Sequence, residues 1–264
     1  MDYQEILYEV EGAVATITLN RPKALNALTR TMRGELLDAL NRTAENENVR
    51  VLVLTGAGKG FCVGQDVKEM SDDYAKEGPE LGRLVESEYI PLVKALRSMP
   101  KPTIALINGT AVGGGMAFPL ACDFRILTEK SSLTPVFVNV GIAPDTGVTY
   151  LLSRAIGHTQ AIELSMRGKT LTPDDLVKWG LAEKVNATLE EAQEETKELA
   201  NRLANGPTQS YWRIRQLYDQ AASSSLEETL ALERDTQDKL AHTADHLEAV
   251  AAFMEKRKPN FTGK

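Results

Sequence analysis

Hydrophobic and polar residues follow strand-like and helix-like periods in turn along the first part of the chain. From Ala13 to Leu19 they alternate, which predicts a half-buried strand. Residues 49–54 are almost continuously apolar and rich in β-branched side chains, which is typical of a strand buried on both faces. Between these strands, apolar residues recur at helical spacing as far as Leu40, behind Thr29 or Thr31 as the capping residue. The chain therefore begins with strand, helix and strand.

The same mixture continues to about residue 147. Pro100 and Pro102 end a predicted helix, because proline disfavours the helical conformation of the residue before it. The acid-rich segment 71–82 is predicted to be an irregular, mobile surface segment. The other elements predicted here are a helix over 84–98, a buried strand over 103–107, an apolar helix over 117–122, strands over 124–127 and 133–138, and a turn over 141–147. Strands that alternate with helices indicate an α/β fold.

From Thr149 onward the helical period dominates. Thr172 is a good helix N-cap ahead of Pro173, and residues 180–185 return briefly to a strand pattern. Amphipathic helices are predicted over 190–205, 208–222 and 226–256, the last of them with one break. We therefore expect an α/β core that carries the active site over residues 1–200 and a helical C-terminal region over residues 201–264.

Composition narrows the class of protein. A chain of 264 residues with 42% hydrophobic and 25% charged residues can form a substantial globular core. A net charge of −7 argues against nonspecific binding of nucleic acid, which depends on clustered Lys and Arg. Cys62 and Cys122 have neither metal-like nor disulfide-like spacing, so we expect no metal and a reducing compartment. Neither an apolar leader nor a membrane-length apolar run is found, and a cytoplasmic protein is expected.

Three consecutive glycines, Gly113 to Gly115, are the most unusual feature of the sequence. Each glycine costs a helix about 1 kcal/mol relative to alanine, so either tight packing or a ligand needs the bare backbone. A second glycine loop ends at Gly64-Gln65 and also follows a short buried strand. If both strands belong to one sheet, an amide from each loop can converge on one oxygen. Such an oxyanion hole stabilises the enolate of a thioester, and each donor contributes about 3–4 kcal/mol.

These motifs occur in the order found in crotonases, the enoyl-CoA hydratase/isomerase superfamily, which this chain resembles over nearly its whole length. The matching motifs are Asn20-Arg21-Pro22, Leu25-Asn26-Ala27-Leu28, Gly60 through Asp66, Lys101-Pro102, Asn108 through Gly115, Cys122-Asp123 and Glu255-Lys256-Arg257. The resemblance implies a spiral of ββα units and a helical C-terminal region that makes trimer contacts. It implies a homotrimer or a dimer of trimers.

The resemblance also implies roles for individual residues. The oxyanion donors would be the backbone amides of Gln65 and Gly114. The residues implied to bind coenzyme A are Lys23, Ala24, Leu25, Lys68, Lys256 and Arg257, the last two reaching phosphates that include those of a neighbouring subunit. The residues implied to line the acyl pocket are Tyr89, Met116, Ala117 and Phe137. The substrate would be an acyl-CoA thioester, with no separate cofactor, and each lysine can equally be a solvated surface charge.

The acids in the pocket decide the reaction. Hydratases resemble one another in carrying one Glu two residues after the third glycine and another four residues before the glycine of the next turn. Those positions hold Ala117 and Phe137, so the pair of carboxylates that hydration needs is missing. Asp145 remains, and it is either a helix N-cap or a catalytic acid. Crotonases that shift double bonds, such as the epoxyphenylacetyl-CoA and dienoyl-CoA isomerases, often carry a single Asp there, which favours an isomerase.

Two alternatives stay open. The chlorobenzoyl-CoA dehalogenases are similar in this turn and use the Asp as a nucleophile, which would make the protein a dehalogenase or an acyl-CoA hydrolase. Their His and Trp correspond to Ile90 and Phe137 here, which argues against hydrolysis. The other alternative is a CoA-binding or RNA-associated relative without catalysis. The acidic composition disfavours RNA, and Asp145 beside two glycine loops disfavours an inactive protein.

Overall fold

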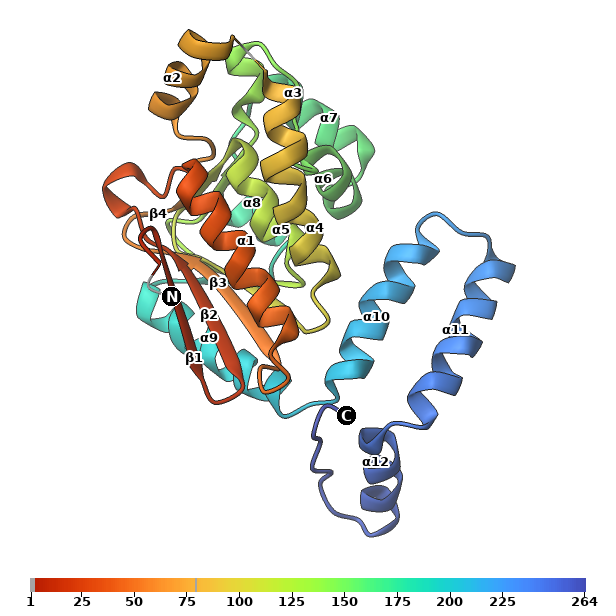
Figure 1. Ribbon diagram of the computed structural model, residues 1–264. Helices are drawn as coiled ribbons and strands as arrows, with labels where there is room; N and C mark the ends of the chain where they lie inside the picture. The colour runs from red at the N-terminus through yellow and green to blue at the C-terminus, as the bar shows by residue number, and fades with distance from the viewer. Residues whose placement is uncertain (1–2, 79) are drawn as a thin grey trace.

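The strands that the structure describes form two sheets (Figure 1). The computed structural model describes residues 3–78 and 80–264, and in this part of the chain the larger sheet has six strands. Their order is β1 (Ile6–Glu11), β2 (Val14–Leu19), β3 (Val51–Gly56), β5 (Thr103–Ile107), β7 (Phe124–Thr128) and β9 (Val185–Asn186). β1 is antiparallel to β2, and the other pairs are parallel. The smaller sheet pairs β4 (Gly60–Cys62), β6 (Thr110–Val112) and β8 (Ser132–Thr134) in parallel.

Each strand of the smaller sheet directly follows a strand of the larger one, so the chain winds as a spiral. The three pairs β3–β4, β5–β6 and β7–β8 each lead into helical structure before the next turn begins. The helices after the first pair are α2 (Val67–Glu77), α3 (Leu81–Leu84), a π-helical turn (Val85–Tyr89) and α4 (Ile90–Ser98). Those after the second and third pairs are α5 (Ala117–Ala121), α6 (Val148–Ile156), α7 (His158–Arg167) and α8 (Pro173–Lys178). The predicted α/β fold of ββα turns is confirmed.

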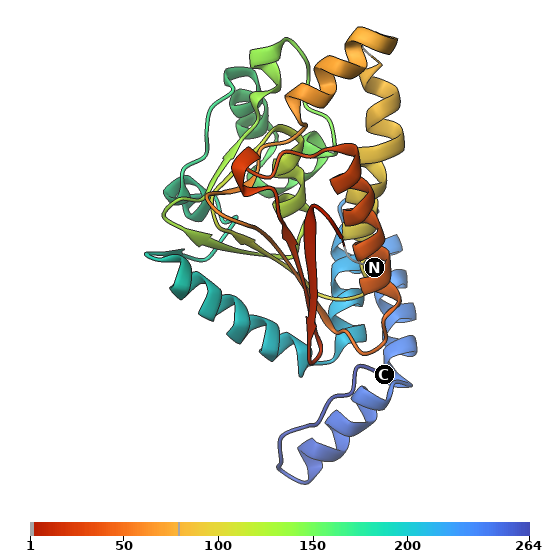
Figure 2. The same cartoon turned by 60° about the vertical axis from the view of Figure 1, so that its left-hand side comes forward.

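Helices cover both faces of the larger sheet (Figure 2). α1 (Arg30–Glu45), α4 and α5 pack on one face through a cluster that includes Leu36, Leu54 and Phe118. α9 (Leu189–Ala204) packs on the other face against Val51, Val53 and other outward residues of the same strands. A parallel sheet buried on both faces explains the continuous apolar runs in its strands. None of the helices described is both long and apolar enough to span a membrane.

Two predictions of local structure are wrong. Residues 71–82 were expected to be irregular, but most of this segment continues α2. The Asp66 side chain accepts hydrogen bonds from the amides of Lys68 and Glu69, at 3.1 and 3.2 Å, and so starts the helix. The strand predicted over 133–138 ends at Thr134, because Pro135 cannot donate to the sheet, and a 3₁₀ helix follows at Val136–Val140.

The capping residues show where two of the predicted helices begin. Thr29, rather than Thr31, caps α1 by accepting a hydrogen bond from the amide of Met32 at 3.1 Å. Thr172 caps α8 and forms a reciprocal capping box with Asp175, as its position ahead of Pro173 predicts. Of the strand predicted over 180–185, only Val185 lies in a strand, which is β9 and includes Asn186.

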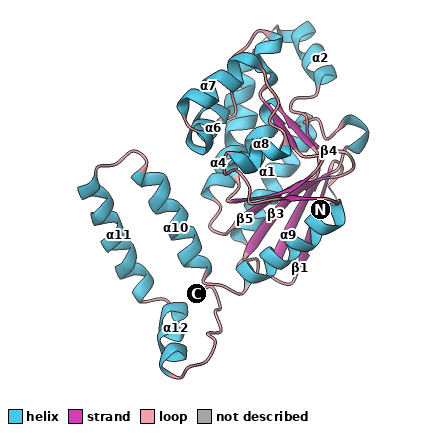
Figure 3. Ribbon diagram, turned by 180° about the vertical axis from the view of Figure 1, so that it is seen from behind, coloured by secondary structure: helices cyan, strands magenta, loops and turns pink. Residues whose placement is uncertain are grey.

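The last two of the three C-terminal helices extend away from the spiral (Figures 1 and 3), whereas the first is joined to the spiral by the ion pair of Arg215 with Asp123. They are α10 (Thr208–Ala221), α11 (Leu226–Ala241) and α12 (Ala244–Met254). The predicted break in the last helix falls at His242-Thr243, where Thr243 caps α12. Large apolar side chains on these helices are exposed in the single chain, among them Tyr218, Leu226, Leu247, Phe253 and Met254. A role for this surface in trimer contacts stays a prediction.

Candidate active site

The two glycine loops meet side by side. β4 and β6 are parallel neighbours, with Cys62 opposite Ala111, so the loops that follow them leave the same edge of the small sheet. A β-carbon built on Gly64 would lie only 3.5 Å from the amide nitrogen of Gly114, and Gly64 has a φ of +83°. A β-carbon on Gly115 would overlap the carbonyl oxygen of Cys62 and lie 2.8 Å from its Sγ. The glycines are therefore required because two backbones approach each other closely.

The second loop forms a 3₁₀ turn. This turn spans Gly113–Met116 and leads into the short helix α5. Since the first N–H groups of a helical turn lack acceptors within the turn, Gly114 has an amide available for another partner. The two loops leave neighbouring strands of one sheet, as predicted, and the convergence of the Gln65 and Gly114 amides on one oxygen stays a prediction.

Two buried asparagines from the shared motifs hold the first loop. The Asn108 side chain accepts a hydrogen bond from Gly56 N at 3.1 Å and donates to the carbonyls of Gly58 and Gly60. Asn26 donates to the carbonyls of Ala57 and Gly60. Both side chains therefore fix the path of the loop and explain why asparagines occur in these motifs.

Lys101, from another of the motifs, has a structural role. It is buried, and its ammonium donates to the carbonyls of Thr43, Ala44 and Asn46 at the C-terminal end of α1. Three carbonyls at this helix end thus share one charged donor group, and the carbonyl of Asn46 also accepts a hydrogen bond from the amide of Val49.

Asp145 lies in the turn before α6 and is linked to the glycine loop through its neighbour. Thr146 Oγ1 donates a hydrogen bond to the Asp145 carboxylate at 2.7 Å. The same Oγ1 would lie 3.2 Å from a β-carbon on Gly114, so Thr146 packs directly against the second loop. Thr146 has a φ of +52°, a strained conformation for a β-branched residue of the kind that clusters at functional sites.

The environment of Asp145 favours its protonated form. Burial raises the pKa of its carboxyl above the ordinary value, and the hydrogen bond from Thr146 opposes part of that rise. The alternative role as helix cap is wrong, because α6 is preceded by Gly147 and no side chain caps it. Asp145 is therefore a partly buried carboxyl group with no role in starting the helix.

The residues predicted to form the acyl pocket lie in the main hydrophobic core around these loops. Tyr89, Met116, Ala117 and Phe137 are all buried there. The Tyr89 ring is close to the site, since its Cε1 would lie 3.7 Å from a β-carbon on Gly114. Burial raises the pKa of the Tyr89 hydroxyl, which keeps it protonated.

Two cavities flank the site. One of about 470 Å³ lies beside Gln65, between α2 and α3, and one of about 690 Å³ lies beside Pro144, the residue before Asp145. None of the four predicted pocket residues lines either cavity. Among residues 3–78 and 80–264, no group of three or more His, Cys, Asp and Glu could hold a metal ion.

Four of the six residues predicted to bind CoA gather around the Gln65 loop. Lys23 and Ala24 form a short 3₁₀ turn, and the carbonyl of Leu25 accepts a hydrogen bond from the amide of Val63. Lys68 is exposed in the first turn of α2. The side chains of Lys23 and Lys68 are therefore both exposed beside the Gln65 loop.

The structure does not bring the other two basic residues to this loop within one chain. Lys256 and Arg257 follow α12 in the separate C-terminal region (Figure 1). Arg257 also forms ion pairs with Glu248 and Glu255, each at 2.6 Å. Any contact of these residues with CoA at a Gln65 loop therefore needs another copy of the chain.

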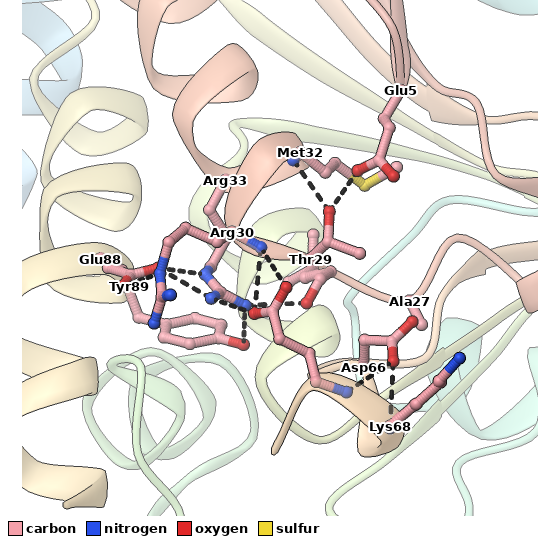
Figure 4. Close-up of polar contacts among 12 residues, drawn as sticks. Glu5, Ala27, Thr29, Arg30, Met32, Arg33, Asp66, Lys68, Glu88 and Tyr89 are labelled. Carbon is pink, nitrogen blue, oxygen red and sulfur yellow. Dashed lines mark hydrogen bonds and ion pairs between the residues drawn. The ribbon is translucent and has the colours of Figure 1, made fainter. Parts of the chain in front are cut away.

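Sequence reasoning missed Arg33 and Thr146. Arg33 is charged yet buried at the N-terminal end of α1, where it contacts Glu69, Glu88 and Tyr89 (Figure 4). Its place on the apolar side of the helix, four residues before Leu37, was a signal that could have identified it. No sequence pattern indicated the positive φ of Thr146.

Comparison with known proteins agrees with this geometry. The sequence profile of the enoyl-CoA hydratase/isomerase family matches residues 9–264. The chain is 38% identical to 1,2-epoxyphenylacetyl-CoA isomerase of Escherichia coli (strain K12), with 98% of each chain covered. It is 36% identical to trans-2-decenoyl-acyl-carrier-protein isomerase of Streptococcus mutans serotype c, with 100% of each covered. It superposes on the crystal structure of enoyl-CoA hydratase from Bacillus anthracis with a TM-score of 0.91 and 33% identity, covering 99% of this chain and 100% of that one. The chain belongs to the enoyl-CoA hydratase/isomerase family.

Proposed function

We propose that the protein is an acyl-CoA isomerase that moves a carbon–carbon double bond, with Asp145 as its single acid and base. The observation that carries this proposal is the position of Asp145. It is a partly buried carboxyl with a raised pKa, and its hydrogen-bond partner Thr146 packs on Gly114. A base works best when its pKa lies near the working pH, and a raised carboxyl pKa moves Asp145 toward that condition.

The reaction conserves all atoms of the substrate. The Asp145 carboxylate removes a proton from the carbon at one end of the allylic system, and the electron pair moves into the thioester carbonyl. The amides of Gln65 and Gly114 hold the enolate oxygen, each contributing about 3–4 kcal/mol if they resemble other oxyanion donors. The protonated Asp145 then returns its proton to the other end of the system, so the double bond moves and the carboxylate is regenerated. No water enters the product.

Residues at two other positions support isomerisation over hydration. Ala117 and Phe137 are buried and apolar where hydratases carry glutamates, so no second carboxylate at either position can orient water. Dehalogenation or acyl-CoA hydrolysis, with Asp145 as nucleophile, is the alternative. The position of the dehalogenase histidine is taken by Ile90, which cannot activate water.

We propose that the CoA moiety binds along the Gln65 loop through Lys23, Ala24, Leu25 and Lys68. Lys256 and Arg257 would reach its phosphates from a neighbouring chain in a homotrimer or a dimer of trimers. The apolar residues Tyr89, Met116, Ala117 and Phe137 would suit an aromatic or medium-chain acyl group. No cofactor is needed, because CoA is part of the substrate.

A product assay tests the proposal. Wild type and Asp145→Asn are incubated with 2-enoyl-CoA and 3-enoyl-CoA thioesters of several chain lengths, with aryl-acetyl-CoA thioesters and with 4-chlorobenzoyl-CoA, and the products are identified by mass spectrometry. Conversion between double-bond isomers by wild type alone supports the proposal. A hydrated acyl group, free acid or released chloride as the main product would refute it.

A further inference from the structure

Arg33 is among the largest fully buried side chains of the chain, with 2% of its surface exposed. Its guanidinium donates to Glu88 through Nε at 2.7 Å and to Glu69 through Nη2 at 2.7 Å. Nη1 donates to the carbonyl of Leu28 at 2.8 Å and to the Tyr89 hydroxyl at 3.3 Å. One side chain thus joins α1, the start of α2 and the π-helical turn (Figure 4).

Two of these contacts, with the Leu28 carbonyl and with Glu69, connect Arg33 to the Gln65 loop. The carbonyl of Leu28 accepts hydrogen bonds from both Arg33 and the amide of Asp66, the latter at 3.1 Å. The amide of Leu28 donates to the carbonyl of Gly64 at 2.8 Å. Leu28 therefore holds the residues on both sides of Gln65, and Arg33 holds Leu28. The ion pair with Glu69 fixes the helix that begins directly after the loop.

The contact with Tyr89 connects Arg33 to Gly114. The Arg33 guanidinium lies 5.1 Å from the centre of the Tyr89 ring as well as bonding its hydroxyl. Tyr89 packs against Gly114, since its Cε1 would lie 3.7 Å from a β-carbon on that glycine. Tyr89 is also the last residue of the π-helical turn, just ahead of Pro91. Because Pro91 has no amide hydrogen, the helix cannot continue with regular hydrogen bonds there, and the π turn carries Glu88 and Tyr89 toward Arg33.

We propose that Arg33 is a positioning residue that keeps the amides of Gln65 and Gly114 at the spacing an enolate oxygen requires. This inference rests on the proposed function, because it assigns Arg33 a task in the same oxyanion hole. Stability alone is a weak reason for the cluster, since buried ion pairs are often replaceable by apolar residues without loss of stability. A rigid planar group that bonds four partners is suited to fixing distances between segments far apart in the sequence.

The test compares Arg33→Lys with Arg42→Lys. Arg42 is on the same helix but is exposed and contacts Tyr3 and Tyr8, away from the loops. Misplacement of reacting groups by about 1 Å can cost roughly 100-fold in rate, so we expect Arg33→Lys to lower kcat by about 10- to 100-fold. KM should change less than kcat, because none of the four groups that the Arg33 guanidinium bonds belongs to a residue proposed to bind CoA, although Lys68 is next to Glu69 in the chain. Arg42→Lys should keep both values.

A spectroscopic readout separates positioning from a general loss of folding. Acetoacetyl-CoA forms an enolate that absorbs in the near ultraviolet, and wild type should strengthen this band when it binds the thioester. Folded Arg33→Lys should bind acetoacetyl-CoA but give a weaker band. Glu69→Gln, which loses one charged partner of Arg33 at a partly exposed site, serves as a second variant if Arg33→Lys does not fold. It should lower kcat in the same direction.

The outcomes distinguish this inference from the proposed function. If folded Arg33→Lys or Glu69→Gln keeps the wild-type kcat and enolate band, Arg33 has only a structural role and the inference is wrong. If wild type neither isomerises enoyl-CoA thioesters nor strengthens the enolate band, the proposed function itself is refuted, and the inference with it.

Discussion

Replacing Thr146 with valine should shift the acidic limb of the pH profile of catalysis to higher pH. Valine keeps the shape and β-branching of threonine, so the strained backbone and the packing on Gly114 change little. The variant loses the hydroxyl that donates to the Asp145 carboxylate at 2.7 Å. Since this bond lowers the pKa of Asp145 and burial raises it, its loss should leave the carboxyl harder to ionise.

The size of the effect follows from the energy of the lost bond. A hydrogen bond to a charged group contributes about 1.5–3 kcal/mol, and the lower end applies because Asp145 is only partly buried. About 1.4 kcal/mol corresponds to a tenfold change in proton affinity, so the acidic limb of the pH profile should move up by about one pH unit. At pH values well above the limb, the rate should fall much less than at its midpoint.

The assay is kcat/KM for double-bond migration measured across the pH range, because this ratio reports ionisations of the free enzyme. Thr146→Ser is the matched control, since it keeps the hydroxyl and should keep the wild-type limb. An acidic limb that stays in place in Thr146→Val, or moves to lower pH, would refute the assignment of Asp145 as the titrating base.

Three further predictions concern stability. Gly115→Ala should unfold at a clearly lower temperature than wild type, because its β-carbon would overlap the backbone of Cys62; Gly82→Ala, with open space around it, is the control that should unfold like wild type. Lys101→Met should lose about 1–3 kcal/mol in chemical denaturation, because the carbonyls of Thr43 and Ala44 lose their charged donor, and activity per folded molecule should be unchanged. A stability equal to wild type would contradict the capping role. Asp145→Asn should be at least as stable as wild type at pH 7. The raised pKa of Asp145 means that ionising its carboxyl destabilises the folded state, and this cost begins as pH rises above about 4. A variant that melts at a lower temperature than wild type at pH 7, but not at pH 3.5, would contradict the raised pKa.

Much of the fold could be predicted because it depends on local sequence patterns. The alternation in β2, the buried run of β3 and the cap at Thr29 each depend on residues close together in the chain. The structure departs from prediction where a single residue overrides the pattern, as when Pro135 ends β8. α2 was missed because its acidic composition was taken as the sign of an irregular segment, although Val67, Met70 and Tyr74 recur at helical spacing. The start of α2 also depends on a cap from Asp66.

The candidate site could be predicted only in part. The glycine loops were visible in the sequence because closely approaching backbones exclude every other residue type. The contacts of Arg33 were not visible, since they join residues up to 56 positions apart through the folded structure. No local sequence pattern indicated the strained φ of Thr146, which packs against Gly114 in the folded chain.

The most direct test of Asp145 as the catalytic base is solvent-deuterium exchange into the acyl chain of an enoyl-CoA thioester, followed by NMR for wild type and Asp145→Asn. If Asp145 is the single base, wild type exchanges protons at the α or γ carbon, because the enolate forms and reprotonates. Asp145→Asn should bind the same thioester but exchange at least about 100-fold more slowly, since it has lost its only proposed base. Equal exchange by both proteins would contradict the single-base mechanism.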